Sequence, residues 1–407
     1  MTRPRPLFRL ALGVLLTLAP FVAGAQDDDN LLQILRRNFA IGSLDVKIQV
    51  IDDAASMERG GFGPLYDSAI AYVLDNASLW LTDARFTGMA RRAVQQIGIE
   101  AYAPSQYSMF RLFLEANEPT LQIDITQAWI KIVESGAEID RGMVAEINRW
   151  LEERNAEFRS GQFPSVSVSV SVLSAVIDVL GAFGDESSFA PLFSALYLGY
   201  VDEVGEHAQA ALAASGGPLA GQLRQILLEA PFEDKLNAYR MALASTTISD
   251  AELGDISERA LEIGLSTVTR DAVERAVTRE LRFLAVAELV ELEWARAAPL
   301  AIDNFNTVLE ELGRGLVGRE RLLQAISFAA VVGTRDAAAR LSQYLVLSNS
   351  LVEGGGSYDE LVLLALVDAL EALGDSIAAD GLIYVSYLDY SGPVKMAARR
   401  AFESLKF

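Results

Sequence analysis

The sequence has 407 residues, of which 34 are Lys or Arg, 55 are Asp or Glu, one is histidine and none is cysteine. A hydrophobic fraction of 51% with 22% charged residues excludes a disordered chain. The lack of cysteine excludes disulfides, thiolate metal sites and cysteine nucleophiles, and the formal net charge of −21 makes nucleic acid and anionic membrane surfaces poor partners.

The first 25 residues are predicted to be a signal peptide. Three arginines precede an apolar stretch at 10–18, and Ala23, Gly24 and Ala25 have the small side chains of a cleavage site. Pro20 cuts the apolar run short of the roughly 20 residues that a membrane span needs. We therefore expect export by the general secretory route with cleavage after Ala25. The protein would then be periplasmic or secreted, without stable membrane insertion after cleavage.

Residues 163–185, FPSVSVSVSVLSAVIDVLGAFGD, begin with alternating serine and valine. That alternation, taken alone, favours a β-strand. An internal repeat favours a helix, because residues 172–212 align without a gap with residues 362–402, and 15 of the 41 pairs are identical. The two segments are therefore copies of one unit.

The second copy also indicates where the helix begins. Ser357 is followed three residues later by Glu360, which is a capping-box pattern, so we expect a helix from Ser357. At the equivalent place in the first copy we expect a helix from about 167 to 183, with Ser165 or Ser167 as its N-cap.

Both copies continue in the same way. The first helix is predicted to end at a glycine, and an aspartate follows as the N-cap of a second amphipathic helix. That helix ends at a pair of tyrosines, and a third helix follows. The residues in these places are Gly184, Asp185, Tyr197 and Tyr200 in the first copy, and Gly374, Asp375, Tyr387 and Tyr390 in the second.

The pattern of apolar helix, glycine, short turn and helix recurs at Gly98, Gly136 and Gly333. The intervals between successive glycines of this kind fit helical-pair repeats of about 40 to 47 residues. Most residues between 216 and 312 are also helical in pattern, although the repeat is less regular there.

These repeats resemble the HEAT family of α-solenoids and its PBS-lyase-like variants. The resemblance rests on AVIDVLGAFGDESSFAPLFSAL with HAQAALAA, and on ALVDALEALGDSIAADGLIYVSYL with VKMAARRAFESL. It covers residues 86–215 and 319–405. The resemblance implies a scaffold that binds other proteins, because HEAT-like arrays mostly serve in that way.

The sequence thus predicts an all-α fold, an α-solenoid of stacked antiparallel helix pairs with about 20 helices in a single elongated array. Its expected segments are a signal peptide (1–25), N-terminal helical repeats (26–160), central HEAT-like repeats (161–245) and C-terminal HEAT-like repeats (246–407).

Several motifs that can indicate catalysis have simpler interpretations. His207 is the only histidine, which excludes His-rich zinc sites, and we expect it to be a partly buried helix residue. GRGLVG at 313–318 matches the dinucleotide-binding pattern but follows a helix, so it is predicted to be a loop. GGFG at 60–63 and GGGS at 354–357 predict flexible connections, and QDDDN at 26–30 predicts a solvated N-terminus rather than a calcium loop. No catalytic residue, metal ligand or cofactor is predicted.

The residues that we consider for contact with a partner are acidic or aromatic. Asp178 and Asp368 repeat on the narrow polar stripe of an apolar helix, and the resemblance places such helices on the concave side of the array. Aromatic side chains often anchor interfaces. The candidates are Asp178, Asp368, Glu371, Tyr197, Tyr200, Tyr387 and Tyr390. Two other interpretations stay open: aspartates that bond to the next repeat's loop, and tyrosines that pack on the adjacent repeat.

We expect an exported, non-catalytic scaffold that binds proteins in the cell envelope, with a basic partner surface as one option. Two alternatives stay open. An envelope hydrolase could act on glycan or peptide with two carboxylates in the concave groove. A small-ligand or cation-binding module could use the acidic charge.

Overall fold

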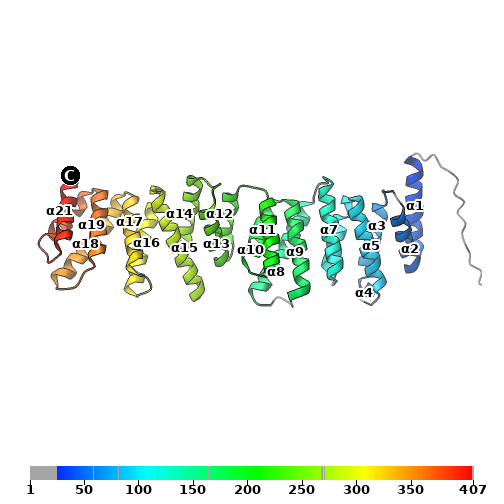
Figure 1. Cartoon of the computed structure of the whole chain (residues 1–407), viewed down its shortest axis with the longest axis horizontal. Helices are drawn as coiled ribbons and strands as arrows, with labels where there is room; N and C mark the ends of the chain where they lie inside the picture. Colours follow the sequence, from blue (N-terminus) through cyan, green and yellow to red (C-terminus); the bar gives the residue numbers. More distant parts are fainter. Residues whose placement is uncertain are drawn as a thin grey trace, which may run out of the picture. The chain divides into compact units, whose positions relative to one another are not determined.

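The structure, a computed structural model, describes residues 25–405 except for 58, 81, 117, 163–165, 267–268 and 270. These residues form 21 α-helices and four short 3-10 helices, and no strand occurs among them (Figure 1). The prediction of an all-α helical repeat array with about 20 helices is confirmed. In the part of the chain that is described, no helix is both long and apolar enough to span a bilayer. The predicted signal peptide lies outside it except for Ala25.

The chain divides into two compact units. The first consists of Met1–Val144 with Ser165–Phe183, and the second of Ala145–Pro164 with Gly184–Phe407. The border falls within helix α8 (Arg141–Arg159).

In the first unit, helices α3, α5, α7 and α9 pack in succession, and α6 packs on both α3 and α7. The core between them contains Tyr66, Ile97 and Trp129, each almost completely buried. The helices of this unit are α1 (Ala25–Ile41), α2 (Leu44–Ser56), α3 (Gly63–Asp75), α4 (Ala77–Trp80), α5 (Ala84–Glu100), α6 (Gln106–Glu115), α7 (Pro119–Glu134) and α9 (Val166–Phe183), with a 3-10 turn at Ala103–Ser105.

In the second unit the helices form two layers. The odd-numbered helices from α13 to α21 pack one on the next, and so do the even-numbered helices from α12 to α20. The helices are α10 (Phe189–Tyr197), α11 (Asp202–Ala214), α12 (Leu219–Glu229), α13 (Phe232–Ala244), α14 (Asp250–Ser266), α15 (Ala272–Glu291), α16 (Ala298–Gly313), α17 (Arg319–Val331), α18 (Arg335–Glu353), α19 (Glu360–Leu373), α20 (Ala379–Val385) and α21 (Gly392–Ser404). Three 3-10 turns, η2 (Glu186–Ser188), η3 (Ala295–Ala297) and η4 (Ser376–Ala378), complete the set.

One hydrophobic core runs through this second unit, from Phe189 to Leu405. Each helix has apolar side chains on more sides than the other helix of its pair can cover. Helices of the neighbouring pairs therefore complete the burial.

The serine–valine stretch is helical, as predicted from the internal repeat. It forms α9, which begins at Val166 and ends at Phe183. Ser165 lies outside the described residues. The valine, leucine and isoleucine side chains between Val170 and Leu180 are buried, and α9 packs against α7. Burial in the helical register therefore outweighs the local preference of valine for strands.

Two predicted helix ends are wrong. The second-copy helix α19 does not begin at Ser357; its N-cap is Asp359, whose carboxylate accepts from the backbone N–H of Leu361 over 3.0 Å and of Val362 over 3.3 Å. A charged carboxylate is favoured at this end of the helix dipole. Gly98 does not end a helix either, because α5 continues to Glu100. It instead lets α5 approach Ala128 of α7 closely.

The other predicted glycine and aspartate positions agree with the structure. Gly136, Gly184, Gly333 and Gly374 all have φ between 62° and 80°, a conformation that side-chain-bearing residues rarely adopt. Asp185 and Asp375 act as N-caps, although each caps a 3-10 turn, η2 or η4, that leads into the second helix. Residues 313–318 form the end of α16 and the connection to α17, and His207 on α11 is partly buried.

The GGFG connection is held in place. The carboxylate of Glu100 accepts from the backbone N–H groups of Gly61, Phe62 and Gly63 over 2.8 to 3.2 Å. A side chain on Gly63 would collide with the ring of Tyr102. The prediction of a connection is correct, but the connection is not flexible, because the carboxylate of Glu100 holds its backbone N–H groups. The acidic QDDDN run forms the first turns of α1.

Gly88 and Gly98 give a matched test of helix packing in the first unit. A methyl group on Gly88 would meet no atom within 4 Å, whereas one on Gly98 would lie 3.0 Å from the Cα of Ala128. We expect Gly88→Ala to raise the free energy of unfolding by about 0.5 to 1 kcal/mol, because alanine favours a helix more than glycine does. Gly98→Leu should lower it by about 1 to 3 kcal/mol, because the added side chain pushes α5 and α7 apart. Urea unfolding followed by circular dichroism measures both, and a Gly98→Leu variant as stable as the wild type would contradict the close packing.

Candidate protein-binding surface

The predicted acidic residues of the second copy form an ion-pair cluster. Arg400 on α21 contacts Asp368 over 3.0 Å and Glu371 over 2.9 Å, and both acidic residues lie on α19. One arginine therefore offsets part of the charge that was expected to attract a basic partner. The first copy does not repeat this cluster, because Gly181 and Ala210 stand in the places of Glu371 and Arg400.

Asp178 is the first-copy counterpart of Asp368. It lies on α9, in the first unit, and is partly buried, whereas the side chain of Asp368 is 58% exposed. The two aspartates thus differ in exposure, although they share a place in the repeat.

The structure buries two of the predicted tyrosines. Tyr200 donates its hydroxyl hydrogen to Oδ1 of Asn155 on α8 over 3.0 Å, and Nδ2 of Asn155 donates to the carbonyl of Pro191 over 2.9 Å. The ring of Tyr200 also contacts Phe158 of α8. Burial raises the pKa of Tyr200, because the ionised phenolate would lose its hydration.

The second copy repeats this arrangement. Tyr390 donates to Oδ1 of Asn349 on α18 over 3.0 Å, and Nδ2 of Asn349 donates to the carbonyl of Gly381 over 3.0 Å. The ring of Tyr390 packs edge to face on Tyr358. Both tyrosines therefore hold their own repeat together, which is the packing interpretation that the sequence left open.

These bonds show that the internal repeat begins earlier than the sequence comparison suggested. Helices α8 and α18 both have 19 residues, and the bonded asparagine is the fifteenth residue of each. A second polar residue, seven positions earlier, also repeats: Asn148 donates to Ser187, and Ser342 donates to the carbonyl of Ile377. The comparison missed these pairs because α19, with 14 residues, is four residues shorter than α9, with 18, so the ungapped register fails there. A comparison that allows one gap would find them.

The remaining predicted tyrosines lie at the surface. Tyr197 is 41% exposed and packs on Phe193, with ring centroids 4.7 Å apart, while Tyr387 is 78% exposed.

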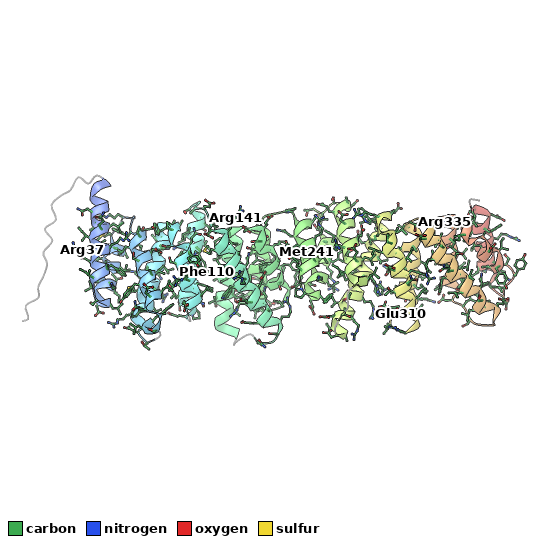
Figure 2. The ribbon with its side chains drawn as sticks, turned by 180° about the vertical axis from the view of Figure 1, so that it is seen from behind. Arg37, Phe110, Arg141, Met241, Glu310 and Arg335 are labelled. Carbon is green, nitrogen blue, oxygen red and sulfur yellow. The ribbon has the colours of Figure 1, made fainter. Side chains whose placement is uncertain are left out.

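Tyr387 belongs to a group of exposed apolar side chains on the last repeat, which begins at Arg335, labelled in Figure 2. Leu347 and Leu351 lie one turn apart on α18. Ile383 lies on α20, and Tyr387 lies two residues beyond its end. A groove of about 270 Å³ lies between the two helices, and of the exposed apolar residues Val346 and Tyr384 line it. We call this surface the α18–α20 face; its exposed apolar members are Val346, Leu347, Leu351, Ile377, Ile383, Tyr384 and Tyr387.

The same positions look different in the first copy. The places of Val346, Leu347 and Leu351 are taken by three glutamates, and those of Ile377 and Tyr384 by two serines. The replacing residues are Glu152, Glu153, Glu157, Ser187 and Ser194. Helices α12 and α13 pack on α10 there, so Phe193 is fully buried, whereas its counterpart Ile383 is 39% exposed.

An ion pair fixes the covering helices in the first copy. Arg159 at the end of α8 contacts Asp234 on α13 over 2.9 Å and donates to Ser194 on α10 over 2.9 Å. A cleft of about 260 Å³ surrounds this pair. Burial raises the pKa of Asp234, and the neighbouring Arg159 lowers it by less.

In the second copy the charge is reversed. Glu353 stands in the place of Arg159, and Tyr384 donates to its carboxylate over 2.7 Å. That hydrogen bond raises the pKa of Tyr384. Among the described residues no helix covers this face, and no ion pair is formed by Glu353.

A scan against protein-family models finds no match to the chain. A search of curated proteins finds none either. Among solved structures, a crystal structure of an engineered protein is similar, with 16% sequence identity and a TM-score of 0.32, over 92% of this chain and 98% of that chain. We infer nothing from it, so the HEAT resemblance stays a prediction.

Removal of one hydroxyl tests the buried tyrosine of the second copy. Tyr390→Phe leaves Oδ1 of Asn349 without its donor, so we expect unfolding to become easier by about 1 to 3 kcal/mol at pH 7. Burial raises the pKa of Tyr390 to about 12, above the value of 10.0 for an exposed tyrosine. The wild type should therefore lose stability between pH 10 and 12, because the unfolded phenol ionises first, and the variant should lack that part of the loss. Urea titrations across this range measure the difference; parallel curves for both proteins would contradict it.

Substitution of Asp234 is expected to raise stability, whereas Tyr390→Phe is expected to lower it. Its pKa is raised in the folded state, so its ionised form costs stability at neutral pH. Asp234→Asn keeps an acceptor for Arg159 and removes the buried charge. We expect the variant to have the higher melting temperature at pH 7, with the difference shrinking as the pH falls and disappearing below the unfolded pKa of 3.8, where the aspartate is protonated in both states. A variant that melts lower at pH 7 would show that the ion pair outweighs the cost of burial.

Proposed function

We propose that this protein is an exported, non-catalytic scaffold of HEAT-like repeats that binds other proteins in the cell envelope. The observation that carries the proposal is the α18–α20 face, where seven apolar side chains between 39% and 78% exposed belong to α18, to α20 and to two residues that flank α20, Ile377 and Tyr387. Grouped apolar side chains of this kind mark protein-binding surfaces, whereas single exposed ones need no explanation.

The comparison between the two copies supports the same conclusion. The first copy has glutamates, Glu153 and Glu157, at the positions equivalent to Leu347 and Leu351. The repeat therefore folds with polar residues at these positions. Leucine at the equivalent positions 347 and 351 is therefore not required by the repeat. A binding role accounts for its presence.

Export is the second part of the proposal. It rests on the basic, apolar and small-residue segments of the first 25 residues. The intact mass of the protein purified from its host would show a chain that begins at Gln26. A mass that includes residue 1 would contradict cleavage.

Affinity purification from cross-linked envelope of the protein's own host tests the binding role. We expect one near-stoichiometric partner with the wild type and its loss with Leu347→Glu/Leu351→Glu, because the substitutions place charge in the interface. Leu316→Glu is the control, since Leu316 is 51% exposed in the connection between α16 and α17 and is not a member of this face. Retention of the partner by the double variant, or no enriched protein at all, would contradict the proposal. An Asp178→Lys/Asp368→Lys variant tests the acidic candidates separately.

A further inference from the structure

We infer that the partner of the α18–α20 face is an amphipathic helix whose apolar stripe is flanked by Lys or Arg. This inference rests on the proposed binding function and specifies the partner's chemistry.

The first copy shows what covers this face in the chain's own packing. Helix α10, the counterpart of α20, is covered by α12 and α13. These are amphipathic helices that contribute Leu223, Ile226 and Tyr239 to the core shared with Phe193. The surface equivalent to the α18–α20 face is thus shaped to receive helices, and Ile383 occupies the position where Phe193 meets them.

The ion pair of the first copy indicates the partner's charge. Arg159 of α8 faces an aspartate, Asp234, on the covering helix α13. In the second copy Glu353 replaces the arginine, so a covering helix would need a basic residue where Asp234 stands.

A second acidic residue strengthens this argument. Asp380 lines the groove between α18 and α20, whereas its first-copy counterpart is the uncharged Ala190. No basic residue occurs in α20 or in the last thirteen residues of α18, from Leu341 to Glu353. The face therefore combines apolar contact area with acidic edges, which favours a basic amphipathic helix over an acidic one.

Two synthetic helices test the inference directly. Both carry the same leucine stripe, one flanked by lysines and the other by glutamates, and each is labelled for fluorescence anisotropy against the full mature chain. We expect the lysine helix to bind and the glutamate helix to bind at least about tenfold more weakly, a difference that shrinks with added salt. Leu347→Glu/Leu351→Glu should weaken binding of the lysine helix by at least about tenfold, and the Leu316→Glu control should leave that binding unchanged.

Charge reversal provides the specific readout. Glu353→Arg introduces the residue that the first copy has at position 159, so folding of the repeat is expected to persist. The variant should favour the glutamate helix over the lysine helix. Equal binding of both helices to the wild type, or a preference unchanged by Glu353→Arg, would overturn the inference. Self-association that Leu347→Glu/Leu351→Glu abolishes would also overturn it, because a second copy would then be the occupant.

The two proposals fail in different ways. An envelope partner lost on Leu347→Glu/Leu351→Glu, together with no preference for the lysine helix, leaves the scaffold standing and removes the inferred chemistry. Selective binding of the lysine helix without any envelope partner would support the inferred chemistry of the face and contradict the proposed scaffold function.

Discussion

The structure depends on one constraint: each helix pair has more apolar surface than the pair itself can bury. In the second unit this constraint produces two layers of helices and one core from Phe189 to Leu405. Every pair relies on its neighbours, so apolar side chains that no neighbouring helix covers stay in water. Among the described residues the α18–α20 face has such side chains, whereas its counterpart on α10 is covered.

Buried polar contacts give each repeat its internal geometry. The asparagines of α8 and α18 accept from a tyrosine and donate to a backbone carbonyl of the short second helix. A hydrogen-bonded pair inside an apolar core fixes orientation, because any other arrangement leaves polar atoms without partners. The two repeats therefore share the same arrangement of helices, although their outer residues differ. Arg159 in the first copy, for example, corresponds to Glu353 in the second.

Much of the fold could be predicted from the sequence, because periodicity and repetition are properties of the chain itself. The internal repeat identifies the serine–valine stretch as a helix, and the glycine pattern predicts four of the glycines with positive φ, at 136, 184, 333 and 374. The cap of α19 was misplaced because Asp359 and Ser357 are both good cap residues, and only the packing selects between them. Gly98 was misinterpreted for a similar reason: a glycine serves a helix end or a close helix contact, and the two uses look alike in sequence.

The candidate site was less predictable. Which residues of an amphipathic helix stay exposed depends on whether another pair covers them, and that is decided by tertiary packing. Tyr200 and Tyr390 are therefore inside, Tyr387 is outside, and the leucines of α18 could not be recognised as surface residues. The central claim is that the last repeat offers its open face to a partner. A photo-crosslinking residue at position 387 in the native host tests this most directly, with position 197 as the matched site in the first copy. The account predicts one discrete adduct from 387 and none from 197. An adduct from 197 alone, or from neither position, would contradict it.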